Sequence, residues 1–264
     1  MTTPALNIAI SAARAAGHVI IRNINRRPDL KIQAKAMNDF VSEVDYQAEF
    51  EIISIIRKAY PNHAILAEES GQHEGDQCEW IIDPLDGTTN YLHGIPHYCV
   101  SIAMREDSKL MLGVVYDPFK EELFCAARGK GATLNNRRIR VSTQGDISTS
   151  LIGTGLPYRT DQIASLDQYM AALRVIIEQN AGVRRAGAAA LDLAYVAAGR
   201  FDGFWETGLH SWDIAAGALL VQEAGGLISD PHGGHDYLQS GDVVAANSKL
   251  YKNLITTINA ATKL

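Results

Sequence analysis

The sequence predicts a mixed fold, with an α+β half over residues 1–145 and an α/β half over residues 146–264, packed as a single compact unit. A chain of 264 residues with 47% apolar composition can bury a substantial core. Apolar and polar residues alternate in YCVSIAMRE and KLMLGVVYD, as is typical of an antiparallel hairpin. From about Gly145, helical and strand patterns alternate instead. Because no repeat or Pro/Ser-rich linker separates the halves, we expect any site to lie between them.

The N-terminal half begins with two predicted helices. Apolar residues recur at helical spacing over residues 4–25, and this helix is expected to end before Pro28. A second helix is expected over residues 44–59, ending before Pro61. Short buried strands follow in AILAEE and EWIID, and the hairpin, joined through residues 106–108, continues into a further strand, ELFCAAR. This half is therefore predicted to be mostly antiparallel.

In the C-terminal half, the apolar patterns predict alternating strands and helices. The expected strands are 151–153, 201–206 and 242–246. The expected helices are 165–180, 187–198 and 211–224, followed by a closing helix.

The net charge argues weakly against a broad surface that binds polyanions. The formal net charge is -6 and the isoelectric point is about 5.7. A local basic cluster, Arg137, Arg138 and Arg140, leaves a restricted contact open. Nucleic acid is therefore not the first partner to consider.

Cysteine use and the N-terminal residues indicate a cytoplasmic protein. Cys78, Cys99 and Cys125 are odd in number and have no CxxC spacing, so we expect reduced thiols. The first predicted helix carries polar residues such as Asn7 and Arg14 within its apolar pattern, without a basic leader before an uninterrupted apolar core. We expect it to be neither a signal peptide nor a membrane span.

The stretch WIIDPLDGTTNY ends a predicted buried strand in two acids. Pro84 cannot continue the hydrogen-bonded ladder and Gly87 permits a sharp change of direction, so one tight turn is expected to carry both Asp83 and Asp86. The Leu85 carbonyl, released from the sheet, is a third candidate oxygen ligand. Taken alone, the same residues are also explained by a strand that simply ends in a turn.

The residues after this turn add an anion site. The amides of Gly87, Thr88 and Thr89 are expected to start a helix, where an anion is favoured. Carboxylates beside an anion site need a cation between them, so the motif favours a metal.

Further acids occupy similar positions. Glu68 follows the predicted strand at Ala64–Ala67, and Asp213 lies in the first turn of a predicted helix, where complementing the helix dipole is the commoner role. Asp39 and Asp45 stand just before another helix. Four candidate ligands carry a total charge of about -4, which two divalent cations would neutralise, and their oxygens favour Mg²⁺ or Mn²⁺ over Zn²⁺. These four are Glu68, Asp83, Asp86 and Asp213. Two such metals beside a helix N-terminus suggest phosphoryl chemistry.

Four segments together resemble the inositol monophosphatase family, most closely its bacterial inositol-1-monophosphatase branch. They are LAEES, WIIDPLDGTTNY, GAAALDLAYVAAGRFDGFWE and HSWDIAAGALLVQEAGG. The resemblance covers nearly the whole chain. It implies an α-β-α-β-α layered fold, Mg²⁺-dependent hydrolysis of phosphate monoesters, inhibition by Li⁺ and frequent homodimers.

The resemblance also implies two principal metal sites. Glu68, Asp83 and the Leu85 carbonyl match the ligands of one Mg²⁺, and Asp83, Asp86 and Asp213 match those of a second. A third, weaker ion would also use Glu68, and Mn²⁺ is expected to substitute for Mg²⁺. The N-terminal half would thus supply most of the ligands, and the C-terminal half would supply Asp213 and the polyol contacts.

The remaining site residues follow from the same match. Asp45 and Thr88 match the pair that orients the attacking water, and with Glu68 they form the expected catalytic set. The other expected substrate contacts are the Gly87 and Thr88 amides for the phosphate, and Gly187, Ala189, Glu206 and Asp213 for the rest of the ester. Two stretches depart from the family pattern: the lysine spacing differs around Lys35, and Thr154–Arg159 does not align with the family's substrate serine.

The predicted function is hydrolysis of inositol monophosphate to inositol and phosphate by direct attack of a metal-activated water, in a cytoplasmic enzyme without membrane contact. An aspartyl-phosphate mechanism would need an Asp-x-Asp pair, and an EF-hand would need oxygen ligands where Leu85 and Gly87 stand. Fructose-1,6-bisphosphatase, or another sugar or nucleotide phosphatase of the same superfamily, is an alternative. Another alternative is an RNA- or transcription-associated regulator with residual phosphatase activity, which would bind through a set of arginines. These are Arg137, Arg138, Arg140, Arg184 and Arg185.

Overall fold

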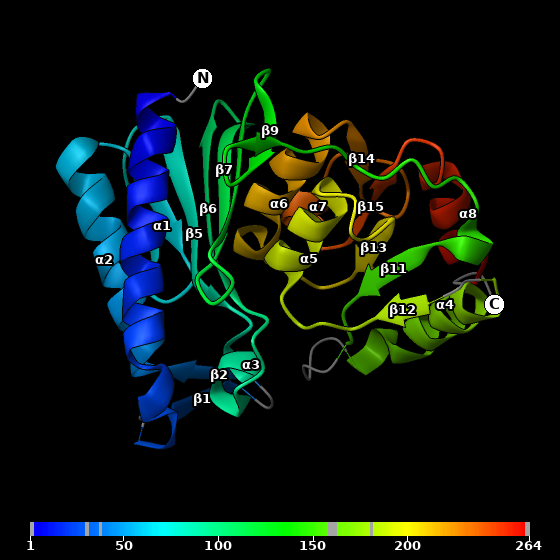
Figure 1. The fold of residues 1–264 in the computed structure, drawn as a ribbon, viewed down its shortest axis with the longest axis horizontal. Helices are drawn as coiled ribbons and strands as arrows, with labels where there is room; N and C mark the ends of the chain where they lie inside the picture. Colours follow the sequence, from blue (N-terminus) through cyan, green and yellow to red (C-terminus); the bar gives the residue numbers. More distant parts are fainter. Residues whose placement is uncertain (1–2, 30–31, 37–38, 158–162, 180–181, 262–264) are drawn as a thin grey trace.

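Five layers, in the order α-β-α-β-α, build the computed structural model, which describes residues 3–29, 32–36, 39–157, 163–179 and 182–261. Figure 1 shows them from left to right. The first layer is α1 (Pro4–Arg22) and α2 (Glu43–Ala59); the third, between the two sheets, is α5 (Ala189–Ala197) and α6 (Ser211–Glu223); the fifth is α4 (Leu166–Gln179) and α8 (Tyr251–Ala261). The predicted layered fold is confirmed.

The first two helices differ from their predicted bounds because of their caps. Helix α1 ends at Arg22 because the Asn23 amide Nδ2 donates to the Val19 carbonyl at 2.9 Å, and the chain continues as a 3-10 turn, η1 (Ile24–Asp29). A small hairpin of β1 (Ile32–Ala36) and β2 (Asp39–Ser42) follows, which the apolar pattern did not predict. Helix α2 begins directly after Ser42, whose side chain caps it.

The larger sheet has eight strands in the order β10-β9-β8-β7-β6-β5-β3-β4. They are β3 (Ala64–Ala67), β4 (Gly71–His73), β5 (Cys78–Asp86), β6 (Cys99–Glu106), β7 (Lys109–Asp117), β8 (Glu122–Ala127), β9 (Gly131–Leu134) and β10 (Arg137–Arg138). Only β3 and β5 pair in parallel. The predicted hairpin is present, and its turn residues Asp107 and Ser108 have φ of 46° and 64°, which suits the twist of a two-residue connection.

The smaller sheet has five strands in the order β12-β11-β13-β15-β14. They are β11 (Leu151–Thr154), β12 (Gly182–Arg184), β13 (Gly203–Glu206), β14 (Gly226–Ser229) and β15 (Val243–Asn247). Strands β12 and β14 were not predicted. The remaining short elements are α3 (Thr88–His93), α7 (Tyr237–Ser240), η2 (Ile147–Thr149) and η3 (Ile163–Ser165).

Small residues let the central helices lie close to the larger sheet. A Cβ on Gly113 of β7 would lie 2.7 Å from the Ala216 carbonyl oxygen of α6, so only glycine fits this approach. A Cβ on Gly217 would likewise lie 2.5 Å from Leu193 of α5. This close packing sets where α6, and therefore Asp213 at its start, stands relative to the sheet.

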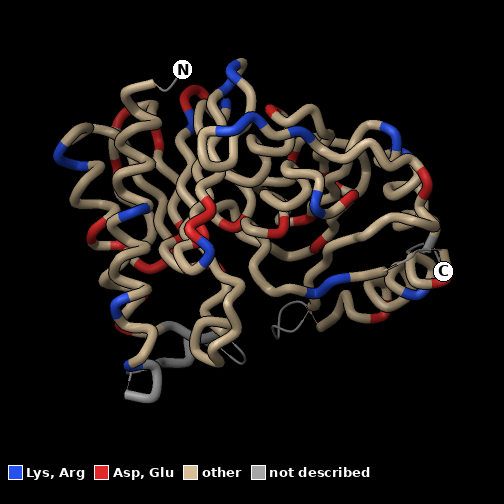
Figure 2. Tube along the Cα trace, viewed as in Figure 1, with Lys and Arg blue, Asp and Glu red and all other residues tan. Residues whose placement is uncertain are grey.

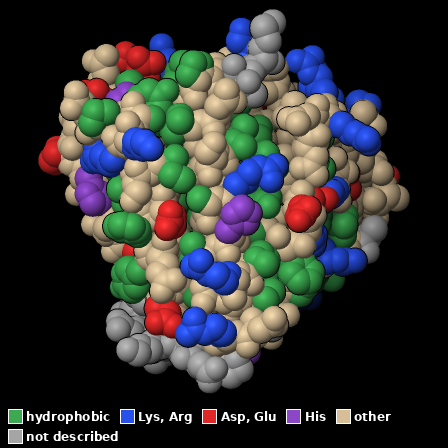
Figure 3. Space-filling model, turned by 60° about the vertical axis from the view of Figure 1, so that its left-hand side comes forward, with side chains coloured by type: hydrophobic (Ala, Val, Ile, Leu, Met, Phe, Trp, Pro, Cys, Tyr) green, Lys and Arg blue, Asp and Glu red, His purple; other side chains and the backbone are tan. Residues whose placement is uncertain are grey.

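One helical stretch, Pro4–Arg26, is long and apolar enough to cross a membrane by length and composition alone. Core helices pass the same test, and Ala9, Ala12 and Ala16 of this stretch are fully buried. Turned so that the α1 and α2 side comes forward, the surface interleaves basic, acidic and hydrophobic side chains (Figure 3). The three cysteines are all described and are free thiols, as expected.

Candidate metal and phosphate site

Strand β5 ends in a bulge that carries the first two acids. Asp83 is paired with Ser101 and Asp86 with Cys99, so three steps along β5 match two along β6. The extra residue falls at Pro84–Leu85, where proline has no N–H to give to the ladder. The Leu85 N–H donates to Asp83 Oδ1 at 2.9 Å, which fixes a carboxylate that is only 2% exposed.

Glu68 lies beside Asp83 because β3 and β5 are parallel neighbours. The Glu68 N–H donates to the Ile82 carbonyl at 3.1 Å, which continues the pairing one residue beyond β3. The following turn is held by Glu49 of α2, whose carboxylate accepts from the Glu69 and Ser70 N–H groups at 2.8 Å each. Sequence analysis did not single out Glu49, although it stands one helical turn after Asp45.

Asp213 is brought to the same place by the N-terminus of α6. Its Oδ2 accepts from the His210 N–H at 2.7 Å, so it closes a capping box as well as facing the site. The Ser101 hydroxyl donates to the Trp212 carbonyl at 3.0 Å, and Ser101 is the β6 partner of Asp83. This hydrogen bond joins residues that are 111 positions apart in the sequence, and it holds the first turn of α6 against the strand beside Asp83.

Electrostatics indicate that these four acids act on one another. Burial raises the pKa of Asp83 well above its usual range, and the charges of Glu68, Asp86 and Asp213 raise it further. Burial also raises the pKa of Asp86 to about 7, although the Ala190 N–H donates to Asp86 Oδ2 at 2.7 Å and partly offsets this. In Figure 2, acidic positions recur in the middle of the molecule, where the larger sheet meets the central helices. A buried carboxylate surrounded by three half-buried ones that repel it is a set of oxygen ligands that fits Mg²⁺.

Asp45 and Thr88 come together from α2 and the start of α3. The Thr88 hydroxyl lies 3.0 Å from Asp45 Oδ1 and 2.9 Å from the Leu85 carbonyl, and its single proton can serve one of them at a time. Asp45 Oδ2 accepts from the Ser42 N–H at 2.9 Å and the Ser42 hydroxyl at 2.6 Å. Burial raises the pKa of Asp45 to about 6, with these hydrogen bonds opposing the shift.

Gly87 has φ 92°, and a Cβ there would lie 2.9 Å from the His97 carbonyl oxygen.

The predicted polyol contacts come from the loop before α5, the first residue of α5 and the end of β13. Gly187 has φ 89°, which prevents α5 from starting at 187 as predicted, and Ala189 is instead its first residue. Glu206 is the last residue of β13, and its carboxylate packs against Gly155. A Cβ added at Gly155 would lie 1.7 Å from Glu206 Oε1, so only glycine leaves room for the carboxylate. Burial raises the pKa of Glu206 well above its usual range. The negative charges of Asp192, Asp213 and Asp86 raise it further, and the positive charge of Arg185 opposes the shift. Glu206 is thus an electrostatic neighbour of two predicted metal ligands.

The structure describes the two stretches that depart from the family pattern only in part. Lys35 lies in β1, and its side chain is outside the described part of the structure. Thr154 ends β11 and is 1% exposed, with its hydroxyl 3.2 Å from the Tyr169 hydroxyl, while residues 158–162 are outside the description.

A further group of possible ligands, His63, Asp76 and Cys78, brings its donor atoms within 4.8 Å of one another. It lies at the other end of β5, which Cys78 begins and Asp86 ends, roughly 25 Å away at the usual rise per strand residue. The Trp80 indole N–H donates to His63 Nδ1 at 3.0 Å, so one imidazole nitrogen already has a partner. This group is separate from the four acids.

The stability of the metal-free protein is expected to fall as pH rises from about 4 to about 7. Asp45 and Asp86 have raised folded-state pKa values of about 6 and about 7, so the stability they contribute is complete below their unfolded pKa of about 4 and is lost as pH rises through the folded values. Thermal unfolding with a chelator present measures this, and Asp86→Asn should give a shallower pH dependence of Tm. An identical dependence in both proteins would contradict the prediction.

Known proteins resemble this chain in sequence and in fold over nearly its whole length. The sequence model described as "Inositol monophosphatase family" matches residues 1–263. Nus factor SuhB of Pseudomonas aeruginosa is 54% identical over 259 residues, which cover 97% of this chain and 96% of that protein. The crystal structure of the extragenic suppressor protein suhB from Bartonella henselae aligns with a TM-score of 0.94 at 42% identity, covering 97% and 98% of the two chains. The inositol monophosphatase from Anabaena (Nostoc) sp. aligns with a TM-score of 0.85 at 39% identity, covering 97% and 95%.

Proposed function

The chain belongs to the inositol monophosphatase family, and we propose that it is a Mg²⁺-dependent phosphomonoesterase that hydrolyses inositol monophosphate to inositol and phosphate. The observation that carries the proposal is the convergence of Glu68, Asp86 and Asp213 on Asp83, whose pKa is raised by its burial and by their charges. Such repulsion around a buried carboxylate is a cost to the fold that bound cations would relieve. The Anabaena relative, an inositol monophosphatase by name, supports the choice of substrate class.

The residues present fit two Mg²⁺ ions. Glu68, Asp83 and the Leu85 carbonyl would hold one, and Asp83, Asp86 and Asp213 the other, with Glu68 also available to a third, weaker ion. When bound, such ions polarise the phosphoryl group, stabilise the leaving alkoxide and lower the pKa of a water molecule. Mn²⁺, with the same preference for oxygen ligands, is expected to substitute.

The chain's own residues would bind the ester and orient the water. The amides of Gly87 and Thr88 would donate to the phosphate, and Glu206 would accept from polyol hydroxyls. With the Leu85 carbonyl given over to a metal ion, the Thr88 hydroxyl would donate its one proton to Asp45 Oδ1, and its lone pairs would be left to accept from the attacking water. The water oxygen would then bond to phosphorus as the bond to the ester oxygen breaks, and the proton that the water gives up would balance the one that the leaving inositol oxygen takes up.

A substrate panel tests this proposal. With Mg²⁺ present, kcat/KM should be highest on inositol monophosphate, lower on fructose 1,6-bisphosphate, 3'-phosphoadenosine 5'-phosphate and histidinol phosphate, and abolished by a chelator. A higher value on one of the other esters would move the assignment to that phosphatase class. Activity that survives removal of divalent metal would contradict the mechanism itself.

A transcription-associated role is the second candidate. It is favoured by the Pseudomonas aeruginosa relative, which is named a Nus factor, and by the exposure of Arg137, Arg138 and Arg140. We propose the transcription machinery as a second partner, beside a second copy of the chain in a homodimer. Capture of RNA polymerase by immobilised wild type, compared with a variant carrying alanine at the three arginines, tests this role separately from phosphatase activity.

Li⁺ should inhibit the phosphatase at millimolar concentrations. The site formed by Asp83, Asp86 and Asp213 presents hard oxygen ligands, which small hard cations prefer, so Li⁺ is expected to occupy it after the ester is cleaved. Turnover at increasing Li⁺, with K⁺ at the same ionic strength as the control, measures this. Equal effects of the two salts would mean that the site is not of this type.

A further inference from the structure

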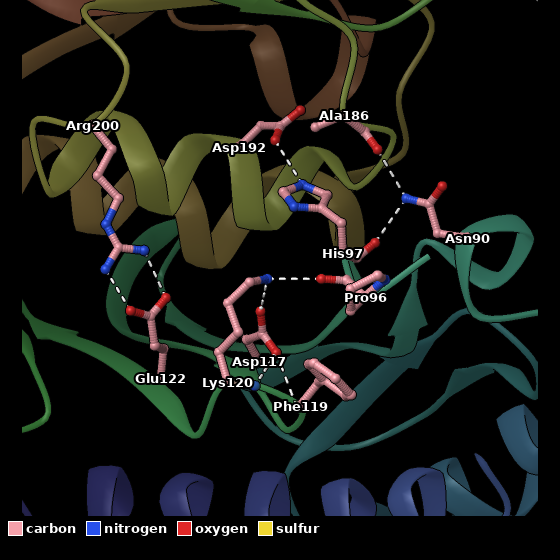
Figure 4. Close-up of polar contacts among 10 residues, drawn as sticks. All are labelled: Asn90, Pro96, His97, Asp117, Phe119, Lys120, Glu122, Ala186, Asp192 and Arg200. Atoms are coloured by element: carbon pink, nitrogen blue, oxygen red, sulfur yellow. Dashed lines mark hydrogen bonds and ion pairs between the residues drawn. The ribbon is translucent and has the colours of Figure 1, made fainter. Parts of the chain in front are cut away.

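Three side chains between the end of β5 and the start of β6 make polar contacts with the start of α5 and the loop before it. The Ala190 N–H donates to Asp86 Oδ2 at 2.7 Å, the Asn90 amide Nδ2 donates to the Ala186 carbonyl at 2.8 Å, and His97 Nε2 lies 2.9 Å from Asp192 Oδ1. The partners are 104, 96 and 95 residues apart in the sequence. Figure 4 shows the second and third contacts side by side. One segment carries the proposed phosphate cradle and the other carries the proposed polyol contacts.

Asn90 has a special place among these contacts because it is buried among carbonyl groups. It is 6% exposed, and its Nδ2 lies 2.7 Å from the His97 carbonyl, 2.8 Å from that of Ala186 and 3.3 Å from that of Gly187. Carbonyl oxygens only accept, and a carboxamide offers two N–H groups. The position therefore requires a donor, and a carboxylate of the same shape would meet the same oxygens with the wrong polarity.

The two loops that Asn90 joins are also in close contact. A Cβ on Gly187 would lie 3.2 Å from Asn90 Nδ2, and one on Gly87 would lie 3.2 Å from the Ala188 Cβ. Asn90 itself lies in the first turn of α3, two residues after Thr88. The Asn90 side chain therefore bridges the phosphate cradle and the segment from Gly187 to Ala189 directly.

We propose that Asn90 is a positioning residue that determines substrate specificity, by holding Gly187 and Ala189 at a set distance from the Gly87–Thr88 cradle. This inference rests on the proposed phosphatase function for the roles of those four residues. His97 supports the same arrangement from the other side, because its carbonyl accepts from Asn90 while its imidazole contacts Asp192 of α5.

Amide hydrogen exchange on the metal-free protein tests the positioning directly. Asn90→Asp, and the milder Asn90→Ser, should speed exchange in peptides that cover residues 186–191, with the serine variant between Asp and wild type because it keeps one donor. Asn247→Ala is the matched control: it is also a buried amide, 2% exposed, whose Nδ2 donates to the Gln144 carbonyl at 2.8 Å. That variant should leave exchange at 186–191 unchanged.

Kinetics then separate specificity from general damage. For Asn90→Asp and Asn90→Ser, kcat/KM on inositol monophosphate should fall about tenfold to a hundredfold more than on phenyl phosphate, mainly through KM, because a small displacement of a binding wall is enough for such a loss. Asn247→Ala should not change the ratio between the two substrates. Equal losses on both esters would overturn the proposal.

The exchange result stands apart from the proposed function. If wild type proves inactive on every phosphate ester, the phosphatase assignment fails, yet faster exchange at 186–191 would still show that Asn90 positions that loop. Unchanged exchange at 186–191 in both Asn90 variants overturns the inference, whatever the activity of the enzyme.

Discussion

Asp83→Asn is expected to lower kcat/KM by roughly two to three orders of magnitude, the range seen when one group that stabilises transition-state charge is removed. Asp83 is the acid proposed to be shared by both metals, so its loss weakens two sites at once. Its carboxylate is also the one on which Glu68, Asp86 and Asp213 all act. The loss should persist at Mg²⁺ concentrations that saturate the wild type.

Asp107→Asn is the matched control, since Asp107 is exposed in the turn between β6 and β7 and asparagine tolerates its φ of 46°. Glu69, the neighbour of Glu68, is less suitable because it is half-buried in the turn that Glu49 holds. Thermal unfolding provides a second measurement: Mg²⁺ should raise the Tm of wild type and Asp107→Asn, and raise that of Asp83→Asn much less. Equal activity losses in both variants would contradict the assignment of Asp83.

Glu206→Gln is expected to depress kcat/KM on inositol monophosphate roughly a hundredfold more than on a small ester such as nitrophenyl phosphate. A site built to bind hydroxyl groups discriminates strongly through them, and nitrophenyl phosphate has none for Glu206 to accept from. Glu206 is placed for this role because it ends β13 close enough to Asp213 and Asp86 for their charges to raise its pKa.

Asp45→Asn and Thr88→Ala should behave differently from Glu206→Gln. Because every ester needs the water that this pair would orient, kcat should fall by a similar factor on both substrates, on the order of a hundredfold. Steady-state kinetics of the three variants on both esters separate the two patterns in one data set. A uniform loss for Glu206→Gln, or a substrate-selective loss for Asp45→Asn, would reverse the two roles.

The fold could be predicted where the pattern is long. The hairpin of β6 and β7, helix α2 and the alternation of the second half all follow from runs of eight or more patterned residues or from repeated elements. Strands β12 and β14 and the hairpin of β1 and β2 were not predicted, although strands as short as β11 and β13 were, and pairing with a neighbouring strand holds them in place. The start of α5 moved from 187 to 189 because the left-handed backbone at Gly187 is incompatible with a helix.

By itself, the sequence determined the chemical type of the site. Asp83, Leu85, Asp86 and the amides after Gly87 occupy one short stretch, and the oxygen ligands and helix start that they provide depend only on local residue types. The roles assigned to these residues, the metals and the cytoplasmic location stay predictions that the experiments above can test.

Only the tertiary structure decided which other residues complete the site and hold it. Glu49 fixes the turn after Glu68, Ser101 ties α6 to β6, and Asn90 joins α3 to the loop before α5, over separations of 20, 111 and 96 residues. Single-residue contacts of this kind leave no periodic trace, because each depends on how sheets and helices pack rather than on neighbours in the chain. The physical reason is that a buried N–H, hydroxyl or carbonyl must find a partner wherever the packing brings one within reach.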